Sequence, residues 1–323
     1  MEPQIKENMK LILGTMNFGP QVNEREGLKM LTTFLDAGFD EIDSAYVYNE
    51  GVTEEMLGSI FRDIPNREFK VATKVNPRVT GKLDKAAINL QITGSLERMA
   101  KDKVQMLYLH MPDPGTPIEE TLEACHSMYE AGKFSELGLS NFPAWMVVDI
   151  WHICDKRGWV KPTVYQGLYN AISRKAEKEL FPALRRLGMR FYAFNPLAGG
   201  LLTGKQLNFN SEPESGRFAR LASYRNRYWK KSYFDAVNLI TKVCTEHEIH
   251  PAQAAYRWLA FHSCLDTQMN DAIIIGASTM EQFNANLQSL KQGHLSDQVL
   301  EAFDAAWHEA INESPDYFYF YKD

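Results

Sequence analysis

Residues 11–45, LILGTMNFGPQVNEREGLKMLTTFLDAGFDEIDSA, contain one complete strand-helix-strand unit. The run at 11–16 is apolar and strand-like, and the segment at 25–38 has the apolar spacing of an amphipathic helix. Gly38 follows this helix, as is common at helix C-termini because glycine adopts positive φ without strain. The run at 39–45 then predicts a second strand. A helix between two strands is typical of a parallel βαβ unit.

The same alternation extends over almost the whole chain at a pitch of about 30 residues. Further strand-like runs lie at 70–75, 104–110, 136–140, 163–169, 189–194 and 272–278. Eight strands predict an α/β protein with a closed (β/α)8 barrel, formed as one domain by residues 1–323. A doubly wound sheet of six units is the alternative, but the number of predicted strands is too high for it. The irregular stretch at about 203–232, after the seventh strand, is expected to be a structureless loop that is either functional or disordered.

Composition limits the classes of function. A net charge of −6 and a pI of about 5.8 argue against nucleic acid as a partner, because its phosphates repel an acidic protein. The four cysteines form no CxxC pair, so neither a zinc site nor a disulfide framework is indicated. The opening MEPQIKENMK lacks the apolar run of a signal peptide, and no stretch approaches the roughly 20 apolar residues that cross a bilayer. We therefore expect a soluble, cytoplasmic protein with no membrane partner.

Polar residues recur where the predicted strands end. In a barrel of this type the chemistry lies at the carboxyl ends of the strands, and all these residues would emerge at that rim. Each of them alone could be a solvated loop residue or a helix cap, whereas the whole set in phase favours a site. The set is Asp43, Lys74, His110, Ser140, Asn141, Gln166, Asn195 and Ser278.

Four of the residues near this rim can be combined into a proton donor. A free tyrosine has a pKa of about 10, too high for efficient proton donation at neutral pH. An ammonium beside the hydroxyl would lower the pKa of Tyr48, and Lys74 could supply it while Asp43 keeps the lysine charged. His110 could donate a hydrogen bond to a substrate carbonyl as a neutral imidazole. The alternatives are that Tyr48 is a rim aromatic, that Asp43 and Lys74 form a structural ion pair, and that His110 caps the turn at Pro112.

Eight stretches occur in the order and spacing of aldo-keto reductase motifs. The whole set, which covers about residue 10 to Phe318, resembles the aflatoxin aldehyde reductase branch of that superfamily. The stretches are IDSAYVYNEGVTEEMLG, VATKVNP, LYLHMPDP, LGLSNF, PTVYQGLYNA, FYAFNPLAGGLLTGK, GRF followed by YRNRYWK, and IIIGASTMEQFNANL.

The resemblance implies a reductase of aldehydes, including dicarbonyls or semialdehydes, that uses NADP(H) without a Rossmann domain and needs no metal. It implies a catalytic tetrad of Asp43, Tyr48, Lys74 and His110, with Tyr48 as the general acid. It also implies a cofactor site along the carboxyl rim. The positions matched to that site are Ser140, Asn141 and Gln166 for the carboxamide, Phe194 for the nicotinamide face, Asn195, Leu197, Gly199, Leu201, Gly204 and Lys205 for the pyrophosphate, Arg217 and Ser278 for the 2′-phosphate, and Gln282 and Asn286 for the adenosine.

The substrate pocket departs from the family pattern. Some members use a C-terminal arginine after the sequence NYF on anionic substrates, whereas this tail reads Asp316-Tyr317-Phe318-Tyr319. Tyr224 and Arg227 do match substrate positions of the branch, along with His110. A preference for carboxylate-bearing aldehydes is therefore expected in a weakened form, and Arg225 is the alternative to Arg227 as the inward residue. Relatives are often homodimers, but the sequence reveals no interface.

Other functions remain alternatives at this point. Potassium-channel β subunits share the barrel and tetrad and act mainly as regulatory binding proteins, and a lapsed enzyme could serve as a scaffold. The stretch GGLLTGK at 199–205 approaches a P-loop but continues with Gln206 where the magnesium-binding Ser or Thr belongs. His247 and His250 are expected to lie at the polar end of a helix before Pro251 rather than in a metal site.

Overall fold

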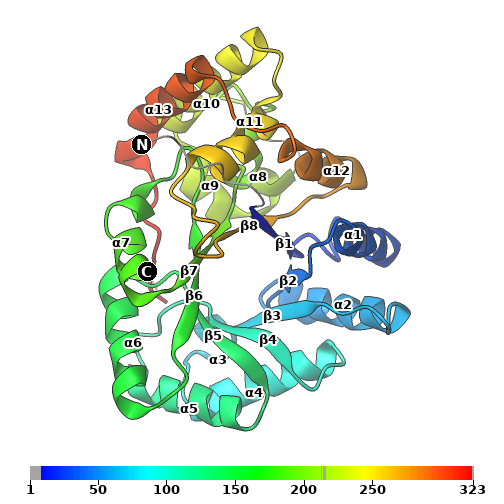
Figure 1. Ribbon diagram of the computed structural model, residues 1–323, viewed down its shortest axis with the longest axis vertical. Helices are drawn as coiled ribbons and strands as arrows, with labels where there is room; N and C mark the ends of the chain where they lie inside the picture. The colour runs from blue at the N-terminus through cyan, green and yellow to red at the C-terminus, as the bar shows by residue number, and fades with distance from the viewer. Residues whose placement is uncertain (1–8, 212, 214–215, 322–323) are drawn as a thin grey trace.

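The computed structural model describes residues 9–211, 213 and 216–321. Its eight strands pair in parallel and in sequence order, and β8 pairs with β1 to close the barrel (Figure 1). The predicted α/β barrel is therefore confirmed, and the doubly wound sheet is excluded because such a sheet stays open. The strands are β1 (Lys10–Gly14), β2 (Glu41–Asp43), β3 (Lys70–Val75), β4 (Val104–Leu109), β5 (Phe134–Ser140), β6 (Pro162–Leu168), β7 (Arg190–Phe194) and β8 (Ala272–Ile275).

Helices follow the strands and cover the outside of the barrel (Figure 1). Those of the first six units are α1 (Glu24–Asp36), η1 (Asn49–Gly51), α2 (Val52–Asp63), α3 (Pro77–Thr80), α4 (Lys85–Arg98), α5 (Ile118–Glu130), α6 (Ala144–Arg157), η2 (Lys175–Glu177) and α7 (Leu180–Leu187). Those after β7 and β8 are η3 (Ala198–Thr203), α8 (Gly216–Arg220), α9 (Ala222–Tyr228), α10 (Lys231–Glu246), α11 (Pro251–Arg257), η4 (Trp258–His262), α12 (Met280–Ser289), α13 (Asp297–Ala310) and η5 (Ile311–Glu313).

The prediction of a structureless loop at 203–232 is wrong. It contains the short helices α8 and α9 and the start of α10. Apolar and aromatic residues cause this folding: Phe218 and Tyr228 are buried, and Trp229 stacks edge-on against Phe218 with the ring centroids 5.4 Å apart. The sequence signal was hidden because each helix is too short to show a helical period.

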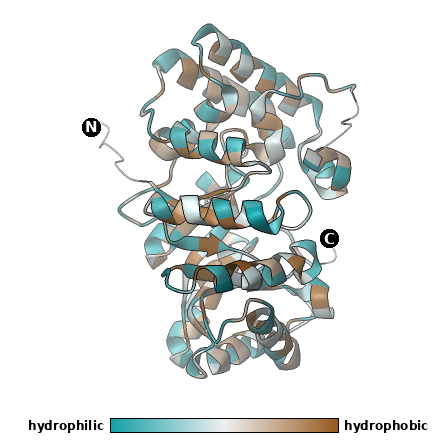
Figure 2. Cartoon of the chain, turned by 90° about the vertical axis from the view of Figure 1, so that its right-hand side faces the viewer, coloured by the Kyte–Doolittle hydropathy of each residue, from teal (hydrophilic) through white to brown (hydrophobic). Residues whose placement is uncertain are grey.

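Two apolar cores hold the molecule together. The larger core fills the space between the strands and the surrounding helices, whose surfaces mix hydrophilic and hydrophobic residues (Figure 2). The smaller core fills the barrel interior and includes Ile12, Ala72, Tyr108 and Val164. Polar side chains close the amino end of this interior, where Lys10 binds Glu41 and the Tyr192 hydroxyl. No helix in the described part of the chain has the length and apolar character to span a bilayer.

Candidate active site

The strand period of two places the polar residues inside the barrel. Residues two apart on a strand point to the same face. Ala72 and Val164 belong to the interior core, so Lys74 and Gln166 enter the same interior one step nearer the carboxyl end. Apolar side chains thus fill the middle of the barrel, and polar groups occupy its carboxyl end.

Asp43, at the end of β2, is the centre of this polar group. Its Oδ1 accepts hydrogen bonds from Lys74 Nζ at 2.6 Å and from Gln166 Nε2 at 2.8 Å. Lys74 also donates to the backbone oxygen of Ser44 at 2.7 Å, and its side chain is fully buried. A buried ammonium and carboxylate keep their charges only when paired in this way.

A tight turn carries Tyr48 to the edge of this group. Tyr48 precedes η1, and the next residue, Asn49, ties the turn to the loop after β1 by donating to the oxygens of Met16 and Phe18. The Tyr48 hydroxyl lies 3.3 Å from Asp43 Oδ2. The Lys74 ammonium lies 5.0 Å from the centroid of the Tyr48 ring.

The expected lowering of the Tyr48 pKa by Lys74 is wrong in the structure. Burial raises the pKa of Tyr48 well above its ordinary value, and the negative charge of Asp43 raises it further. Burial also lowers the pKa of Lys74, although Asp43 opposes that shift. The sequence places Lys74 beside the tyrosine but does not reveal that its hydrogen bonds go to Asp43 and Ser44. Tyr48 is accordingly held in the protonated form, which a proton donor requires.

His110 directly follows β4, and its backbone N–H continues the strand pairing by donating to Val75 at 2.9 Å. Its ring meets the Tyr48 ring edge-on, with the centroids 6.3 Å apart. Burial lowers the pKa of His110 well below its usual range, and the charges of Lys74 and Arg78 act in the same direction. The lowered pKa favours the neutral imidazole that the sequence analysis expects, and the buried Nδ1 has no hydrogen-bond partner among the described residues.

One large cavity, of about 1720 Å³, unites most of the predicted residues. Asp43, Tyr48 and His110 line it, while Lys74 lies buried behind Asp43 and does not. Two predicted positions, Leu201 and Gly204, are also absent from the lining: Leu201 is fully buried, and Gly204 packs against Thr241 and Pro251. The remaining predicted residues in the lining are Ser140, Asn141, Gln166, Phe194, Asn195, Leu197, Gly199, Lys205, Arg217, Tyr224, Arg227, Ser278, Gln282 and Asn286.

Two asparagines turn the chain sharply where strands meet the cavity. Asn141 and Asn195 have φ values of 64° and 55°, a left-handed conformation that asparagine tolerates better than most residues. Asn141 Nδ2 donates to the His110 oxygen at 2.8 Å, which fixes the turns after β4 and β5 together. Asn195 Nδ2 is buried and makes no hydrogen bond of ordinary length among the described residues, although it lies near enough to the Tyr228 hydroxyl to oppose the rise of the Tyr228 pKa. Unpaired buried donors in a cavity are typical of a ligand site.

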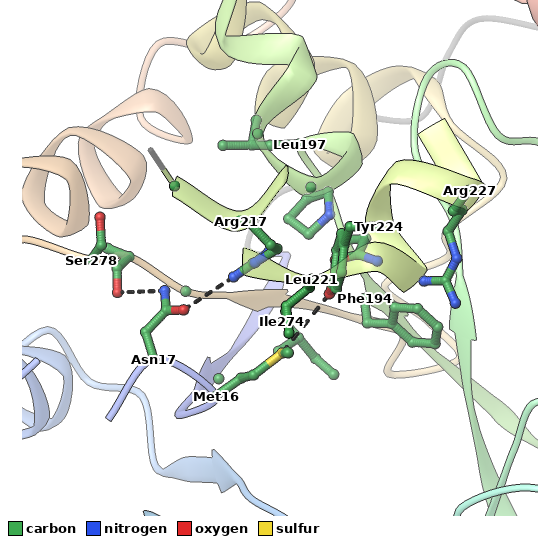
Figure 3. Close-up of a pocket in the computed structure, with 18 of the residues that line it drawn as sticks. Met16, Asn17, Phe194, Leu197, Arg217, Leu221, Tyr224, Arg227, Ile274 and Ser278 are labelled. Carbon is green, nitrogen blue, oxygen red and sulfur yellow. Dashed lines mark hydrogen bonds between the residues drawn. The ribbon is translucent and has the colours of Figure 1, made fainter. Parts of the chain in front are cut away.

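The helices α8 and α9 reach across the cavity to the loop after β1. Arg217 donates to Asn17 at 3.2 Å, and the Tyr224 hydroxyl lies 3.1 Å from Asn195 Oδ1. Figure 3 shows Arg217 and Arg227 on either side of Tyr224, and their guanidinium carbons lie 4.9 Å and 5.7 Å from the centroid of its ring. Arg227 lines the cavity whereas Arg225 does not, which resolves the alternative between them in favour of Arg227.

Sequence reasoning missed many residues of the lining, among them Asn17, Arg78 and Tyr319. Asn17 lies three residues beyond the end of β1, so the rule applied to the other strand ends could have found it. Tyr319 comes from the tail, which crosses the rim by donating its backbone N–H to the Asn141 oxygen at 3.3 Å. Nothing in the local sequence indicates that contact.

The rejected motifs have ordinary structural explanations. Gly199 and Gly200 lie in η3 with φ values of 71° and 107°, and the segment after η3 is not a helix that could hold a phosphate as a P-loop does. The imidazole of His250 caps α11 by accepting from the Ala252 N–H at 3.2 Å. Among the described residues no group of three or more His, Cys, Asp or Glu side chains is arranged to hold a metal ion.

Known proteins resemble this chain in sequence over most of its length. The sequence model of the Aldo/keto reductase family matches residues 10–308. The chain belongs to this family. It is 43% identical over 318 residues to aldo-keto reductase family 7 member A3 of Homo sapiens, a match that covers 95% of this chain and 96% of that protein. It is 42% identical to aflatoxin B1 aldehyde reductase member 2 of Mus musculus, with 95% and 87% of the two chains covered.

Membership makes this aldo-keto reductase an oxidoreductase, and the resemblance seen in the sequence is confirmed. A third relative, aflatoxin B1 aldehyde reductase member 4 of Homo sapiens, is 41% identical and covers 95% of the chain and 96% of its own length. These relatives cover 95% of the chain, and the family model itself matches a range that contains α8 and α9 as well as the barrel strands.

Proposed function

We propose that this aldo-keto reductase reduces aldehydes to alcohols with NADPH, and that Tyr48 donates the proton. The convergence of Tyr48, His110 and the Asp43–Lys74 pair on one wall of the 1720 Å³ cavity carries the proposal. That volume exceeds what a small aldehyde requires and leaves room for a dinucleotide. Three relatives at 41% identity or more bear names that include aldo-keto reductase or aldehyde reductase.

The cavity fits an extended nicotinamide dinucleotide. We propose that Ser140, Asn141 and Gln166 bind the carboxamide and that the Phe194 ring packs on the nicotinamide. The unpaired Asn195 Nδ2 and the backbone near Leu197, Gly199 and Lys205 would contact the pyrophosphate. Arg217 and Ser278 would bind the 2′-phosphate, and Gln282 and Asn286 the adenosine. Ser278 Oγ already lies 2.9 Å from Gln282 Oε1, so these two groups form one polar surface.

The proton chemistry follows from the pKa directions. NADPH, when bound, supplies the hydride that reaches the aldehyde carbon. Tyr48 is protonated because burial and Asp43 raise its pKa, so its hydroxyl can give a proton to the oxygen of the forming alcohol. His110 is neutral and can donate an N–H to the same oxygen, which stabilises the developing negative charge. Solvent reprotonates the resulting phenolate before the next turnover.

Lys74 and Asp43 serve this step without contacting the substrate. The ammonium lies 5.0 Å from the Tyr48 ring and stabilises the phenolate that remains after proton transfer. Asp43 holds the lysine in place and keeps it charged despite its complete burial. The ammonium thus favours the phenolate, whereas the Asp43 charge opposes it by raising the pKa of Tyr48.

Arg227 and Tyr224 suit an aldehyde that carries a carboxylate. Both line the cavity, and Arg227 packs against the rings of Tyr224 and Tyr228 at 5.7 Å and 5.9 Å. A guanidinium held between aromatic rings offers its N–H fork to a carboxylate with little loss of side-chain freedom. We propose that semialdehyde acids are better substrates than their neutral analogues.

Tyr48→Phe tests the proposed function. Turnover of NADPH with a small aldehyde should fall by about two to four orders of magnitude, the usual contribution of a general acid. NADPH binding, measured by quenching of protein fluorescence, should persist because the hydroxyl holds only Asp43. Tyr46→Phe is the matched control, since Tyr46 packs on Arg98 at 4.6 Å and is not part of the lining. Near-native turnover in Tyr48→Phe would rule out the proposed acid.

A further inference from the structure

Arg78 is a cation at the cavity wall that the proposed function does not use. It lies in α3, the short turn after β3, four residues beyond Lys74. Asn76 caps this turn by accepting from the Arg78 N–H at 2.9 Å, and Gly81 ends it with φ at 80°. The backbone of Arg78 is therefore fixed while its side chain reaches the cavity lining from an exposed position.

Within the described part of the chain, no carboxylate neutralises Arg78. The contact of its guanidinium there is with the Tyr319 ring, whose centroid lies 5.7 Å away. Of the acids in the lining, Asp43 is paired with Lys74 and Asp316 with Lys175 at 2.9 Å. Glu281 belongs to the first turn of α12, after β8, which is three strands away from β3 around the barrel.

The position of Arg78 is close to the reacting centre. Its charge is one of the causes that lower the pKa of His110, the residue proposed to hold the carbonyl oxygen. Arg78 and Arg227 line the same cavity, Arg78 from α3 and Arg227 from α9, and among the described residues no carboxylate pairs with either guanidinium.

We propose that Arg78 is a second anion-recognition residue of the substrate pocket, and that together with Arg227 it selects carbonyl substrates that carry two carboxylates. The inference rests on the proposed function, in which Arg227 binds a first carboxylate. A guanidinium fork matches the geometry of a carboxylate, and a second carboxylate would neutralise the remaining cation at the mouth. Tyr319 would support the Arg78 guanidinium from its ring face.

A rigid series of aldehydes with increasing charge tests this directly. The series is benzaldehyde, 3-formylbenzoate and 5-formylisophthalate, with the dimethyl ester of the last as a neutral compound of matched shape. In the native enzyme kcat/KM should rise with each carboxylate. In Arg78→Gln the ratio of kcat/KM for the diacid to that for the monoacid should fall by about tenfold, the low end for a charge-assisted hydrogen bond because Arg78 is exposed. The loss should be mainly in KM, because the anchor binds substrate and transition state alike.

Two further variants separate recognition from general charge effects. Arg78→Lys keeps the charge but loses the fork, so it should recover only part of the ratio. Lys85→Gln removes one exposed positive charge from the start of α4, outside the lining, and should leave the ratio unchanged. An unchanged ratio in Arg78→Gln would overturn the proposal, whether activity on the two acids stays native or falls equally for both.

Isophthalate binding distinguishes this proposal from the proposed function. Isothermal titration with isophthalate needs no turnover, and Arg78→Gln should bind it about tenfold more weakly than the native protein. If the native enzyme reduces none of the aldehydes, the proposed function fails while the titration still reports on Arg78. If isophthalate binds both proteins equally, the role of Arg78 is refuted whatever the activity.

Discussion

The Lys74 ammonium faces the ring of Tyr48, 5.0 Å from its centroid, and does not contact the hydroxyl. Its hydrogen bonds go to Asp43 and to the backbone oxygen of Ser44. Lys74 thus acts on the phenol through space and through the carboxylate that it shares with the Tyr48 hydroxyl. Removing the lysine should therefore alter both catalysis and stability, and the two effects can be separated.

Lys74→Met should lower turnover steeply and should abolish the acid-base pH profile of the residual rate. The same change leaves the Asp43 carboxylate buried without its partner, which costs about 3 to 5 kcal/mol of stability. The double variant Lys74→Met with Asp43→Asn removes the unpaired charge, so the free energy of unfolding in urea should recover while activity should not. Native turnover in either variant would show that the lysine is only structural.

The pH dependence of stability should report on His110. Its pKa is lowered in the folded protein, so the unfolded chain binds a proton that the folded protein refuses. This contribution to stability is complete above the unfolded pKa of about 6.5 and is lost as pH falls below it, by at most about 1.4 kcal/mol per pH unit. The free energy of unfolding should therefore fall less steeply from about pH 7 to about pH 5 in His110→Gln than in the native protein. Parallel curves would mean that His110 is not held neutral by folding.

Arg217→Ala should weaken NADPH binding by about ten- to a hundredfold and should leave NADH binding much less affected, because only NADPH carries the 2′-phosphate. Dissociation constants from fluorescence quenching provide the measurement. Arg220→Ala is the control, since Arg220 lies on the same helix but is exposed and outside the lining. Equal losses for the two cofactors would show that Arg217 supports α8 and α9 through Asn17 instead of binding phosphate.

Arg227→Ala should remove the preference for a semialdehyde acid over its methyl ester. In the native enzyme the acid should be favoured by about tenfold, toward the lower end for a charge-assisted hydrogen bond, because the tail provides no second arginine. Arg225→Ala, which changes the neighbouring cation outside the lining, should keep the preference. A native enzyme that uses acid and ester equally well would indicate selection by shape alone.

The barrel could be predicted from sequence because each strand is an apolar run and each long helix has a clear period. The ends of the strands were harder to predict where a strand contains polar residues or stops before its apolar run does. The run 39–45 contributes only Glu41–Asp43 to β2, since the chain then turns toward Tyr48. The rule that polar residues at strand ends share a rim located most of the site, because parallel strands in a barrel all end on one side.

What the sequence did not reveal depends on contacts between distant segments. Lys74 donates to the backbone oxygen of Ser44 and not to the Tyr48 hydroxyl. The position of that oxygen depends on the folded turn, so the sequence alone does not reveal it. Likewise, Arg78 and Tyr319 are 241 positions apart (319 − 78) and meet because the tail crosses the rim. Leu201 and Gly204 do not line the cavity because η3 turns Leu201 toward the protein interior and ends beside α10 and α11 at Gly204, and their contact with a cofactor stays a prediction.

Asp43 joins opposite walls of the barrel, since Lys74 comes from β3 beside it and Gln166 from β6, four strands away from β2 in either direction. Any ligand that draws the Gln166 amide toward itself takes a hydrogen-bond donor away from the same carboxylate oxygen that holds Lys74. Coupling of this kind is reciprocal, so a change in the Asp43–Lys74 contact must alter the affinity for that ligand by the same factor. Ligand binding at the Gln166 wall and the hydrogen bonding of Lys74 at the opposite wall are therefore one coupled equilibrium.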